Sequence, residues 1–396
     1  MHTIGIIAEY NPFHSGHHYH IQEVRRTFGQ DCAVVCAMSG NWVQRGEAAI
    51  TDKWTRSLFA LQGGADLILE IPTPWAVSSA ETFAQSGVSL LDATGLVDTI
   101  SFGSEAGQLA PLQAVAACID SPTWQEHLRE GLRHGLSFPA ARQKAVSALL
   151  GPDADCLRTP NNNLAVEYLR AMERLGSPMA PHTLSRLGAG HDADDPSSLP
   201  HASASYLRQQ IITEHPRALS PFLPADTEAV LRQDPASLAF CTQGILARLR
   251  TMTEADLARL PDSGEGLSQR LYAAVQTAAT LPELYDLTKT KRYPMARIRR
   301  LVLWAFLGLT ETDRPQNIPY LRVLGFSPRG QLLLRQMKHT AALPILTKPA
   351  HAEKLSHEVS SLFHLEARCT LLYDLCRKSF GQSAGKNEYT QNPIRV

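Results

Sequence analysis

The feature of this sequence that most constrains the fold is a short apolar run followed at once by a histidine-rich turn. Residues 4–8, Ile-Gly-Ile-Ile-Ala, are uninterrupted apolar positions, and Pro12 lies just beyond them. Such a run is typical of a strand buried on both faces of a parallel sheet, which a proline cannot continue. The chain after His14 has helical apolar spacing as far as Phe28. The sequence therefore predicts a strand–turn–helix unit whose polar turn lies at the carboxyl edge of a sheet.

Two histidines of this turn, His14 and His17, are separated by Ser15 and Gly16. Imidazoles at a helix N-terminus suit the charge that develops on phosphate during nucleotidyl transfer, and the glycine permits close backbone approach. Neither the dinucleotide fingerprint nor the P-loop glycine pattern is present. Histidines that merely satisfy a turn are the alternative. We expect no metal site, because no nearby cysteine or carboxylate completes a zinc ligand set.

Residues 1–190 alternate between strand-like and helix-like segments. The apolar patterns predict further strands at residues 33–38, 65–71 and 99–102, and helices at residues 53–62, 78–91 and 164–175. This alternation indicates an α/β fold with a parallel, doubly wound sheet. Right-handed crossovers would bring the strand ends together along one edge, at His14, Ser39-Gly40, Glu70 and Phe102-Gly103.

The second half of the chain has helical spacing almost throughout, with short strands expected at residues 322–326 and 344–348. We expect a Rossmann-like catalytic domain over residues 1–200 and a mainly helical, basic region over residues 201–396. Residues 188–200 read as a mobile loop, and the last dozen residues as a frayed tail. The formal net charge is zero, yet residues 271–396 hold 18 Lys and Arg against 9 Asp and Glu. This asymmetry suggests an acidic catalytic half joined to a basic region.

Several loops carry side chains suited to anions or nucleotides. Asn41, Gln44 and Arg45 follow the second strand and offer donors to a ligand. Lys53 and Arg56 share one helix face, which fits either anion contact or an ordinary solvated surface. The remaining candidates are the turn at residues 102–105 for adenine, Asn161 and Asn162 as caps or ligand contacts, Arg186 for phosphate, and Ser203, Ser205 and Arg208 around a helix start.

One segment, residues 288–300, has six cations and no acid, with Tyr293 among them. Its cations are Lys289, Lys291, Arg292, Arg297, Arg299 and Arg300. A basic edge of this kind indicates a nucleic-acid surface, and a solvated helix face is the alternative.

Bulk features suggest a cytoplasmic protein without membrane association. The N-terminus lacks the basic region of a signal peptide, and the longest apolar stretch, residues 301–309, is too short to span a bilayer. Seven cysteines without regular spacing make no disulfide framework.

Together these segments resemble a bacterial family, the tRNA(Met) cytidine acetate ligases. The resemblance covers nearly the whole chain and is carried by the segments at residues 5–20, 39–49, 52–54, 64–72, 102–105, 160–162, 186–191, 203–208, 291–300 and 322–326. It implies a Rossmann-like H-x-G-H nucleotidyltransferase domain followed by a mostly α-helical C-terminal region.

The resemblance also implies roles for individual residues. His14 and His17 would be catalytic, and Ser203, Ser205 and Arg208 would form a mobile phosphate-binding motif in a segment, residues 188–208, that closes over the site. ATP would be bound by Ile7, Ala8, Glu9, Tyr10, Asn11, Pro12, Phe13, His14, Ser15, Gly16, His17, His18, Tyr19, His20, Gly103, Asn161 or Asn162, Arg186 and Leu187.

The activity implied is a two-step ligation. Acetate attacks the α-phosphate of ATP, and the acetyl group then passes to N4 of the wobble cytidine of elongator tRNA(Met). Mg²⁺ is expected to arrive with ATP, and no obligatory protein partner is expected. Two alternatives stay open: a small-molecule adenylyltransferase with no RNA substrate, and an RNA-binding protein without catalysis.

Overall fold

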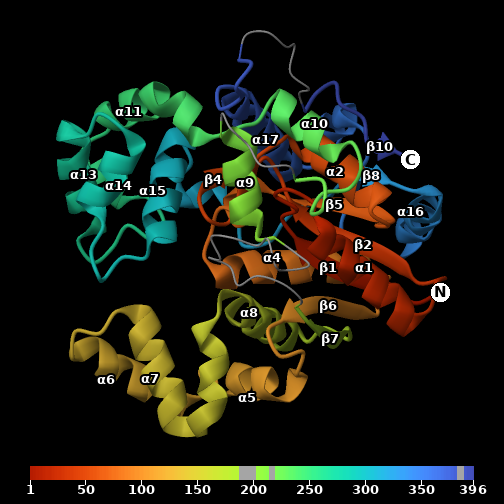
Figure 1. Cartoon of the computed structure of the whole chain (residues 1–396), viewed down its shortest axis with the longest axis horizontal. Helices are drawn as coiled ribbons and strands as arrows, with labels where there is room; N and C mark the ends of the chain where they lie inside the picture. Colours follow the sequence, from red (N-terminus) through yellow and green to blue (C-terminus); the bar gives the residue numbers. More distant parts are fainter. Residues whose placement is uncertain (187–201, 214–218, 381–387) are drawn as a thin grey trace.

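The computed structural model describes residues 1–186, 202–213, 219–380 and 388–396, and its centre is an eight-stranded sheet of order β10-β8-β5-β2-β1-β6-β7 with β9 beside β8 (Figure 1). Its strands are β1 (Thr3–Ala8), β2 (Ala33–Ser39), β5 (Leu67–Ile71), β6 (Thr99–Ser104), β7 (Ala180–Ser185), β8 (Leu321–Phe326), β9 (Ile345–Leu346) and β10 (Ile394–Arg395). A separate hairpin pairs β3 (Trp42–Val43) with β4 (Glu47–Ala48). All pairings in the large sheet are parallel except that of β5 with β8.

The strand order creates a crevice at the carboxyl end of β1. From β1 the chain proceeds outward to β2 and β5, then returns to place β6 and β7 on the other side of β1. The strand order therefore reverses between the neighbouring strands β1 and β6, and open α/β sheets bind ligands at such a reversal. The expected α/β fold and parallel sheet are confirmed.

Helices cover both faces of the sheet. In the first half they are α1 (Ser15–Phe28), α2 (Lys53–Gln62), α3 (Thr73–Ala76), α4 (Ala80–Asp92), α5 (Leu109–Ile119), α6 (Pro122–Arg133), α7 (Phe138–Leu150) and α8 (Pro160–Leu175), with the 3-10 helix η1 (Gly151–Arg158). The β2 residues alternate between two cores, Val34 and Cys36 on the side of α1 and α2, Val35 and Ala37 on the side of α4. A strand buried on both faces needs this unbroken apolar sequence.

Helix α4 approaches β1 especially closely. A Cβ at Gly87 would meet Ile7 Cγ2 at 2.7 Å, so only glycine fits where the helix crosses the strand. This contact fixes the start of α4 beside the carboxyl end of β1.

The C-terminal half contains α9 (Ala204–Ile212), α10 (Thr227–Gln233), α11 (Thr242–Arg250), α12 (Glu254–Ala258), α13 (Leu267–Thr277), α14 (Leu281–Thr288), α15 (Met295–Leu307), α16 (Pro328–Thr340) and α17 (His357–Asp374), with η2 (Leu238–Cys241), η3 (Glu311–Asp313) and η4 (Pro349–Lys354). Helices α11–α15 form a lobe beside the sheet, whereas α16 and α17 return to it (Figure 1). The division at residue 200 stays a prediction, and the sheet takes strands from both sides of it. No helix among the described parts of the chain is long and apolar enough to cross a membrane.

The tail expected to fray is instead partly built into the fold. β10 pairs in parallel with β8, and Glu388 is only 1% exposed. The hairpin β3–β4 and strand β7 were not expected from the sequence either. The loop expected at residues 188–200 lies outside the described residues.

A buried ion cluster holds this tail to the sheet. Lys53 Nζ lies 2.6 Å from Glu70 Oε1 and also donates to Glu388, which lies 3.7 Å from Arg322 Nη2. Burial alone would lower the pKa of Lys53, but Glu388 and Glu70 raise it. Burial, together with Glu70, raises the pKa of neighbouring Glu366 to about 8. The cluster itself holds two cations, Lys53 and Arg322, against two carboxylates, Glu70 and Glu388.

Neither Lys53 nor Arg56 contacts solvent or an external anion, so both interpretations of that helix face were wrong. Arg56 is fully buried and donates to the backbone oxygens of Thr51, Glu9, Ser39 and Gly40. It thus joins the ends of β1 and β2.

Lys53→Met should lower the free energy of unfolding by about 3–5 kcal/mol, because it leaves Glu70 buried without a cation and Glu388 with Arg322 alone. Chemical denaturation would measure the loss. The control Lys144→Met, at an exposed position of α7, should change stability by less than about 0.5 kcal/mol. A loss at Lys53 no larger than the control's would contradict the structural role of the cluster.

Candidate active site

A cavity of about 280 Å³ opens at the carboxyl ends of β1 and β6. Its walls come from the turn after β1, the loop after β2, the starts of α4 and α8, and α9. Of the residues expected from the sequence, it is lined by Ile7, Ala8, Glu9, Tyr10, Asn11, His14, His17, His20, Gln44, Arg45, Phe102, Gly103, Asn161, Arg186, Ser203 and Arg208. The fold therefore brings together segments from six separate parts of the chain.

The side chains of His14 and His17 cap helix α1, because each accepts a backbone N–H at the start of the helix. His14 Nδ1 accepts the N–H of Gly16 at 3.0 Å, and His17 Nδ1 accepts the N–H of His14 at 3.3 Å. The two rings stack with centroids 3.8 Å apart. Tyr10 packs edge-on against the His17 ring, with centroids 4.9 Å apart.

This capping decides where the imidazole protons are. A neutral ring that accepts a hydrogen bond at Nδ1 carries its hydrogen on Nε2. Burial lowers the pKa of His17 well below its usual value, and the charges of His14 and Arg186 lower it further. Burial similarly lowers the pKa of His20 to about 4. The His17 ring is therefore a neutral Nε2–H donor at physiological pH.

The backbone N–H groups at the start of α1 are largely occupied. Gly16 donates to His14, and the N–H of Ser15 donates to the carbonyl of Phe222 at 2.8 Å. This helix end therefore offers few unbonded N–H groups to an anion. The side chains of the turn must carry most of the interaction with an anion.

The opposite wall is a polar chain that joins three loops. Arg186 donates to Asn161 Oδ1 at 3.0 Å, and Asn161 Nδ2 donates to Glu105 Oε1 at 2.9 Å. Asn162 Oδ1 accepts the Glu105 N–H at 3.1 Å and does not line the cavity. Asn161 therefore lines the cavity, whereas Asn162 holds the turn at residues 102–105 through the backbone of that turn.

A third group, on α9, faces the histidines. Ser203 caps the helix by accepting the Tyr206 N–H at 3.1 Å. Arg208 Nη1 donates to the Asn11 carbonyl at 2.8 Å, its Nη2 donates to Ser205 Oγ at 3.3 Å, and it lies 3.6 Å from Glu47. Arg208 is therefore a cation held beside the histidine turn.

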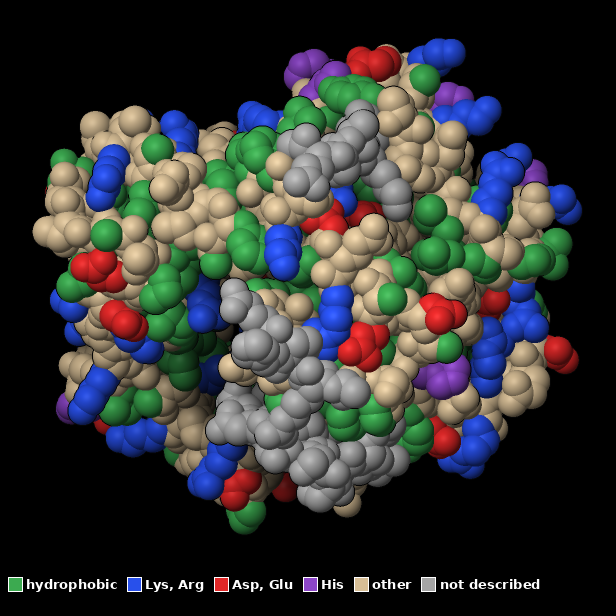
Figure 2. Space-filling model, turned by 45° about the horizontal axis from the view of Figure 1, so that its top comes forward, with side chains coloured by type: hydrophobic (Ala, Val, Ile, Leu, Met, Phe, Trp, Pro, Cys, Tyr) green, Lys and Arg blue, Asp and Glu red, His purple; other side chains and the backbone are tan. Residues whose placement is uncertain are grey.

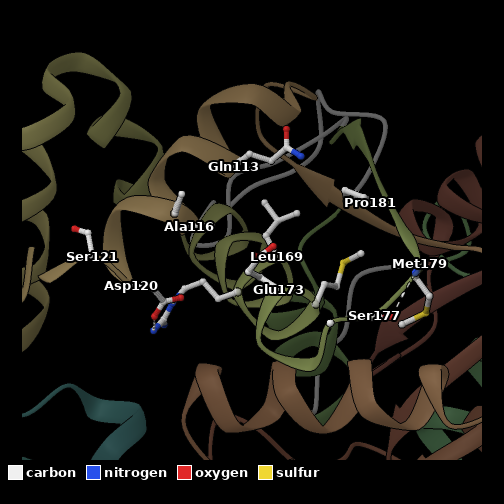
Figure 3. A pocket seen from close by; sticks show the side chains of 13 residues that line it. Gln113, Ala116, Asp120, Ser121, Leu169, Glu173, Ser177, Met179 and Pro181 are labelled. Carbon is white, nitrogen blue, oxygen red and sulfur yellow. Dashed lines mark hydrogen bonds and ion pairs between the residues drawn. The ribbon is translucent and has the colours of Figure 1, made fainter.

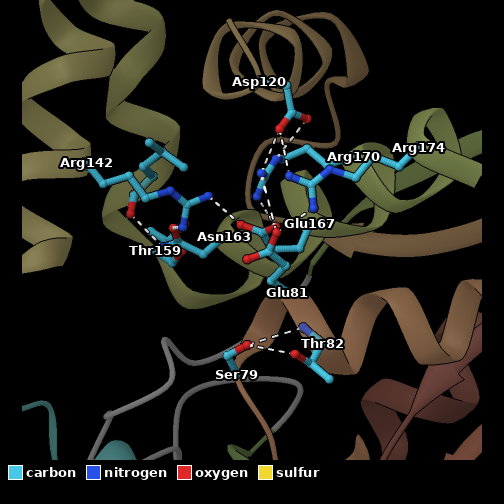
Figure 4. A network of polar contacts seen from close by, with 11 residues as sticks. Ser79, Glu81, Thr82, Asp120, Arg142, Thr159, Asn163, Glu167, Arg170 and Arg174 are labelled. Atoms are coloured by element: carbon cyan, nitrogen blue, oxygen red, sulfur yellow. Dashed lines mark hydrogen bonds and ion pairs between the residues drawn. The ribbon is translucent and has the colours of Figure 1, made fainter. Parts of the chain in front are cut away.

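Helix α8, which carries Asn161 and Tyr168, is anchored by a network of arginines and carboxylates (Figure 4). Arg170 binds Asp120 at 2.8 Å and Glu167 at 2.5 Å, and Arg142 binds Glu167 at 2.8 Å. Arg174 adds ion pairs to Asp120 and Glu81. These pairs tie α8 to α4, α5 and α7, and so fix the wall of the cavity that α8 forms.

Other residues expected at the site lie outside the cavity lining. Phe13 packs against Gly63, and His18 Nδ1 bonds to the Gly63 carbonyl at 3.1 Å. Pro12, Ser15, Gly16, Tyr19, Asn162 and Ser205 likewise do not line the cavity, and Leu187 lies outside the described residues. Asn41 is buried and bonds within the protein, to the backbone of Lys53 and to Thr370.

No pattern in the sequence marks Phe83 and Tyr168 as part of the cavity wall. Phe83 on α4 and Tyr168 on α8 line the cavity, and the rings of Phe102 and Tyr168 are 5.7 Å apart. These residues occupy the apolar faces of their helices, where a cavity wall and a packed core have the same sequence pattern.

A larger hollow of about 800 Å³ lies between α5, α8 and β7 (Figure 3). Of its three charged side chains, Asp120 and Arg170 bind each other and Glu173 is exposed, and none of the sequence motifs reaches it. Size alone therefore does not make it the candidate active site.

The basic segment lies on the helical lobe that flanks the cavity. Lys289, Lys291 and Arg292 are exposed, whereas the α15 arginines are paired: Arg297 with Glu265 at 2.7 Å, Arg300 with Asp262 at 3.5 Å, and Arg299 with Glu47. Figure 2 shows Lys and Arg side chains in the hollow beside this lobe. Because Glu47 also approaches Arg208, one carboxylate connects the cavity to α15.

Comparisons with known proteins agree with this geometry. The family model described as HIGH Nucleotidyl Transferase matches residues 1–388. A tRNA(Met) cytidine acetate ligase of Thermoanaerobacter sp. (strain X514) is 37% identical over 395 residues and 96% of each chain, and one of Acetivibrio thermocellus is 34% identical over 415 residues and the whole of both.

Solved structures extend the comparison. Thermotoga maritima TmcAL in its apo form is 29% identical with a TM-score of 0.93, covering 100% of both chains. The same protein bound with alpha-thio ATP has a TM-score of 0.91, covering 100% of this chain and 99% of that one. The resemblance in the sequence is thereby confirmed, and the chain belongs to the tRNA(Met) cytidine acetate ligase family within the HIGH nucleotidyl transferases.

Proposed function

We propose that this protein is an ATP-dependent ligase that joins acetate to a cytidine of elongator tRNA(Met), at N4 of the wobble base. The observation that carries the proposal is the mutually capped pair His14 and His17, which lies with Arg208 and Arg186 in one cavity at the switch point of the sheet. The names of the relatives supply the substrates, and the alpha-thio ATP in the TmcAL structure supports ATP as one of them.

In the first step an acetate oxygen attacks the α-phosphorus of ATP, and the bond from that phosphorus to the bridging oxygen of pyrophosphate breaks. Acetate is ionised at neutral pH, so this attack needs no general base. The protein must instead position the reactants and stabilise the charge that grows on the phosphate oxygens. We assign this stabilisation to His14 and His17 as Nε2–H donors, with Arg208 as the cation facing them.

ATP is placed by the two other walls. Asn161 and Arg186, held together with Glu105, are suited to contact the nucleotide beside Gly103 at the end of β6. In the second step N4 of cytosine attacks the acetyl carbon of acetyl-adenylate, AMP leaves with the bridging oxygen, and N4 loses a proton. The intermediate is a mixed anhydride that water would hydrolyse, so we expect α9 to close over the site during the reaction.

Mg²⁺ fits this site as a companion of ATP rather than as an ion held by the protein. Among the described residues that line the cavity, Glu9 is the single carboxylate, which is too few for a protein cage. When bound to the phosphates, the ion would neutralise charge on the leaving pyrophosphate. All seven cysteines are free thiols, which supports a reducing compartment such as the cytoplasm.

For the RNA we propose the basic segment, with its three exposed cations as the first contacts. Lys289, Lys291 and Arg292 have no acidic side chain within ion-pair distance among the described residues. The paired α15 arginines are less available, because a phosphate would have to compete with Glu265, Glu47 and Asp262.

Removing either imidazole should slow the first step while the protein stays folded. We expect His14→Ala or His17→Ala to lower acetate-dependent exchange of labelled pyrophosphate into ATP by about 10²–10³-fold, the usual cost of one lost donor to developing charge. The control His339→Ala, at an exposed position of α16, should leave the exchange rate unchanged. Exchange at the wild-type rate in both cavity variants would rule out this catalytic assignment.

Reversing the exposed cations should weaken RNA binding without affecting ATP chemistry. We expect Lys291→Glu with Arg292→Glu to weaken tRNA binding and to make the plot of log K against log salt shallower by about two, because two phosphate contacts are lost. Pyrophosphate exchange should not change.

The matched control reverses two exposed cations of α16, Arg335→Glu with Lys338→Glu, and should bind tRNA as the wild type does. If the basic-segment variant keeps both its tRNA affinity and its salt slope, a small-molecule adenylyltransferase becomes the better description.

A further inference from the structure

Glu9 is placed at the cavity in a way that the activation of acetate does not explain. Its backbone carbonyl accepts Arg56 Nη1 at 2.6 Å, and its Oε1 accepts the Gln44 N–H at 2.7 Å. Among the described residues no hydrogen bond reaches its other carboxyl oxygen, Oε2, which is not among the fully buried atoms without a partner. A rigidly held carboxylate thus presents one oxygen to the cavity.

The residues that hold Glu9 are themselves fixed. Gln44 Nε2 donates to the Ser78 carbonyl at 3.1 Å, so the loop after β2 is tied to the segment before α4. Gly46, at φ 74°, lets this loop lie against the backbone of Arg299 and Arg300, which a Cβ would strike at 2.5 Å. One carboxyl oxygen of Glu9 is therefore held by the backbone N–H of Gln44, and the loop that supplies this N–H is itself held in place on two sides.

An aromatic surface lies beside this carboxylate. Phe83 and Tyr168 line the same cavity and are 1% and 4% exposed, and Phe102 packs against Tyr168. Tyr168 lies close enough to Glu9 for that charge to raise the pKa of its phenol, after the larger effect of burial. An apolar wall next to one hydrogen-bond acceptor suits the edge of an unstacked base, whose exocyclic amine would meet the acceptor.

We propose that this wall, Glu9 with Phe83 and Tyr168, is the receiving site for the cytosine base, and that Glu9 is the general base of acetyl transfer. The inference rests on the proposed function and names the residue that completes its second step. As the bond from N4 to the acetyl carbon forms, the bond from that carbon to the phosphate oxygen of AMP breaks. The proton leaves N4 for Glu9 Oε2, and later passes to solvent.

The chemistry of cytosine makes such a group necessary. The N4 lone pair is delocalised into the ring, so the amine attacks well only if a base takes its proton as the new bond forms. Burial raises the pKa of Glu9 above its ordinary value, and the Gln44 N–H, Arg208, Arg56 and Arg45 act in the opposite direction. Glu9 is thus a stronger base than an exposed glutamate while its arginine neighbours favour the ionised form.

The two steps of the reaction separate this role from the other roles that a cavity carboxylate could have. We expect Glu9→Gln, which keeps the size and the acceptor for the Gln44 N–H, to lower acetate-dependent pyrophosphate exchange far less than it lowers acetyl transfer. Transfer of labelled acetyl groups to tRNA in a single turnover should fall by about 10²–10⁴-fold. The matched control is Glu126→Gln, at an exposed position of α6 away from the cavity, whose transfer rate should not change.

The pH dependence gives a second readout. The transfer rate of the wild type should fall as pH decreases through the pKa of one group, because the base must be ionised. Glu9→Asp should transfer more slowly but keep the acidic limb, the fall in transfer rate as pH decreases. Glu9→Gln should lose this acidic limb. If Glu9 had a purely structural role, its replacement would not abolish the pH dependence of the transfer rate alone.

Three results would overturn the inference: an equal loss in both steps of Glu9→Gln, which would assign Glu9 to ATP or its cation; transfer within about threefold of wild type; or an acidic limb that persists in Glu9→Gln. Should Glu9→Gln fail to fold, absence of the acidic limb from Glu9→Asp would overturn it too. If the wild type itself acetylates no tRNA, the proposed function fails instead, and the two failures are distinguishable.

Discussion

The rest of the site depends on the mutual capping of His14 and His17. The Nδ1 atom of each ring accepts a backbone N–H at the start of α1, so a neutral ring can donate to a ligand only through Nε2–H. Because the backbone donors at this helix end are already bonded to protein, phosphate must be met by side chains rather than by open N–H groups. A helix start that would otherwise be a general anion site thereby becomes a pair of oriented donors, with Arg208 held beside them through the Asn11 carbonyl.

Two charged networks keep the surrounding walls in place. On one side of the sheet, Lys53 with Glu70 and Glu388 binds the C-terminal segment beneath the loop that follows β2. On the other, the arginines of α8 tie it to α4, α5 and α7, so that Asn161 and Tyr168 face the crevice. Both networks lie outside the cavity. They fix the positions of the strand ends and helix starts that carry the site residues. The reaction requires such fixed positions, because two or three reactants must be aligned.

Much of this arrangement could be predicted from the sequence. The buried strands β1 and β2, helix α2 and the grouping of the strand ends follow from apolar runs, breakers and the handedness of crossovers. Other features could not be predicted, because their cause lies far away along the chain. Lys53 reads as a surface cation until Glu388, 335 residues later, is brought against it. Phe83 and Tyr168 read as core, and the short strand β10 is formed by pairing with β8 rather than by its own propensity. The pairing of Arg297, Arg299 and Arg300 with acids is hidden for the same reason, since none of those acids lies within the basic segment.

In the proposed mechanism, an ionised acid displaces pyrophosphate from ATP in the histidine-lined crevice before any acetyl group reaches RNA. The fate of the acetate oxygen atoms distinguishes this order of steps from others. The protein would be supplied with acetate carrying ¹⁸O at both carboxyl positions, together with ATP and tRNA, and the products would be analysed by mass spectrometry. We expect AMP that contains one ¹⁸O atom for each acetylated cytidine. AMP without label, or label found in pyrophosphate or phosphate, would contradict this mechanism.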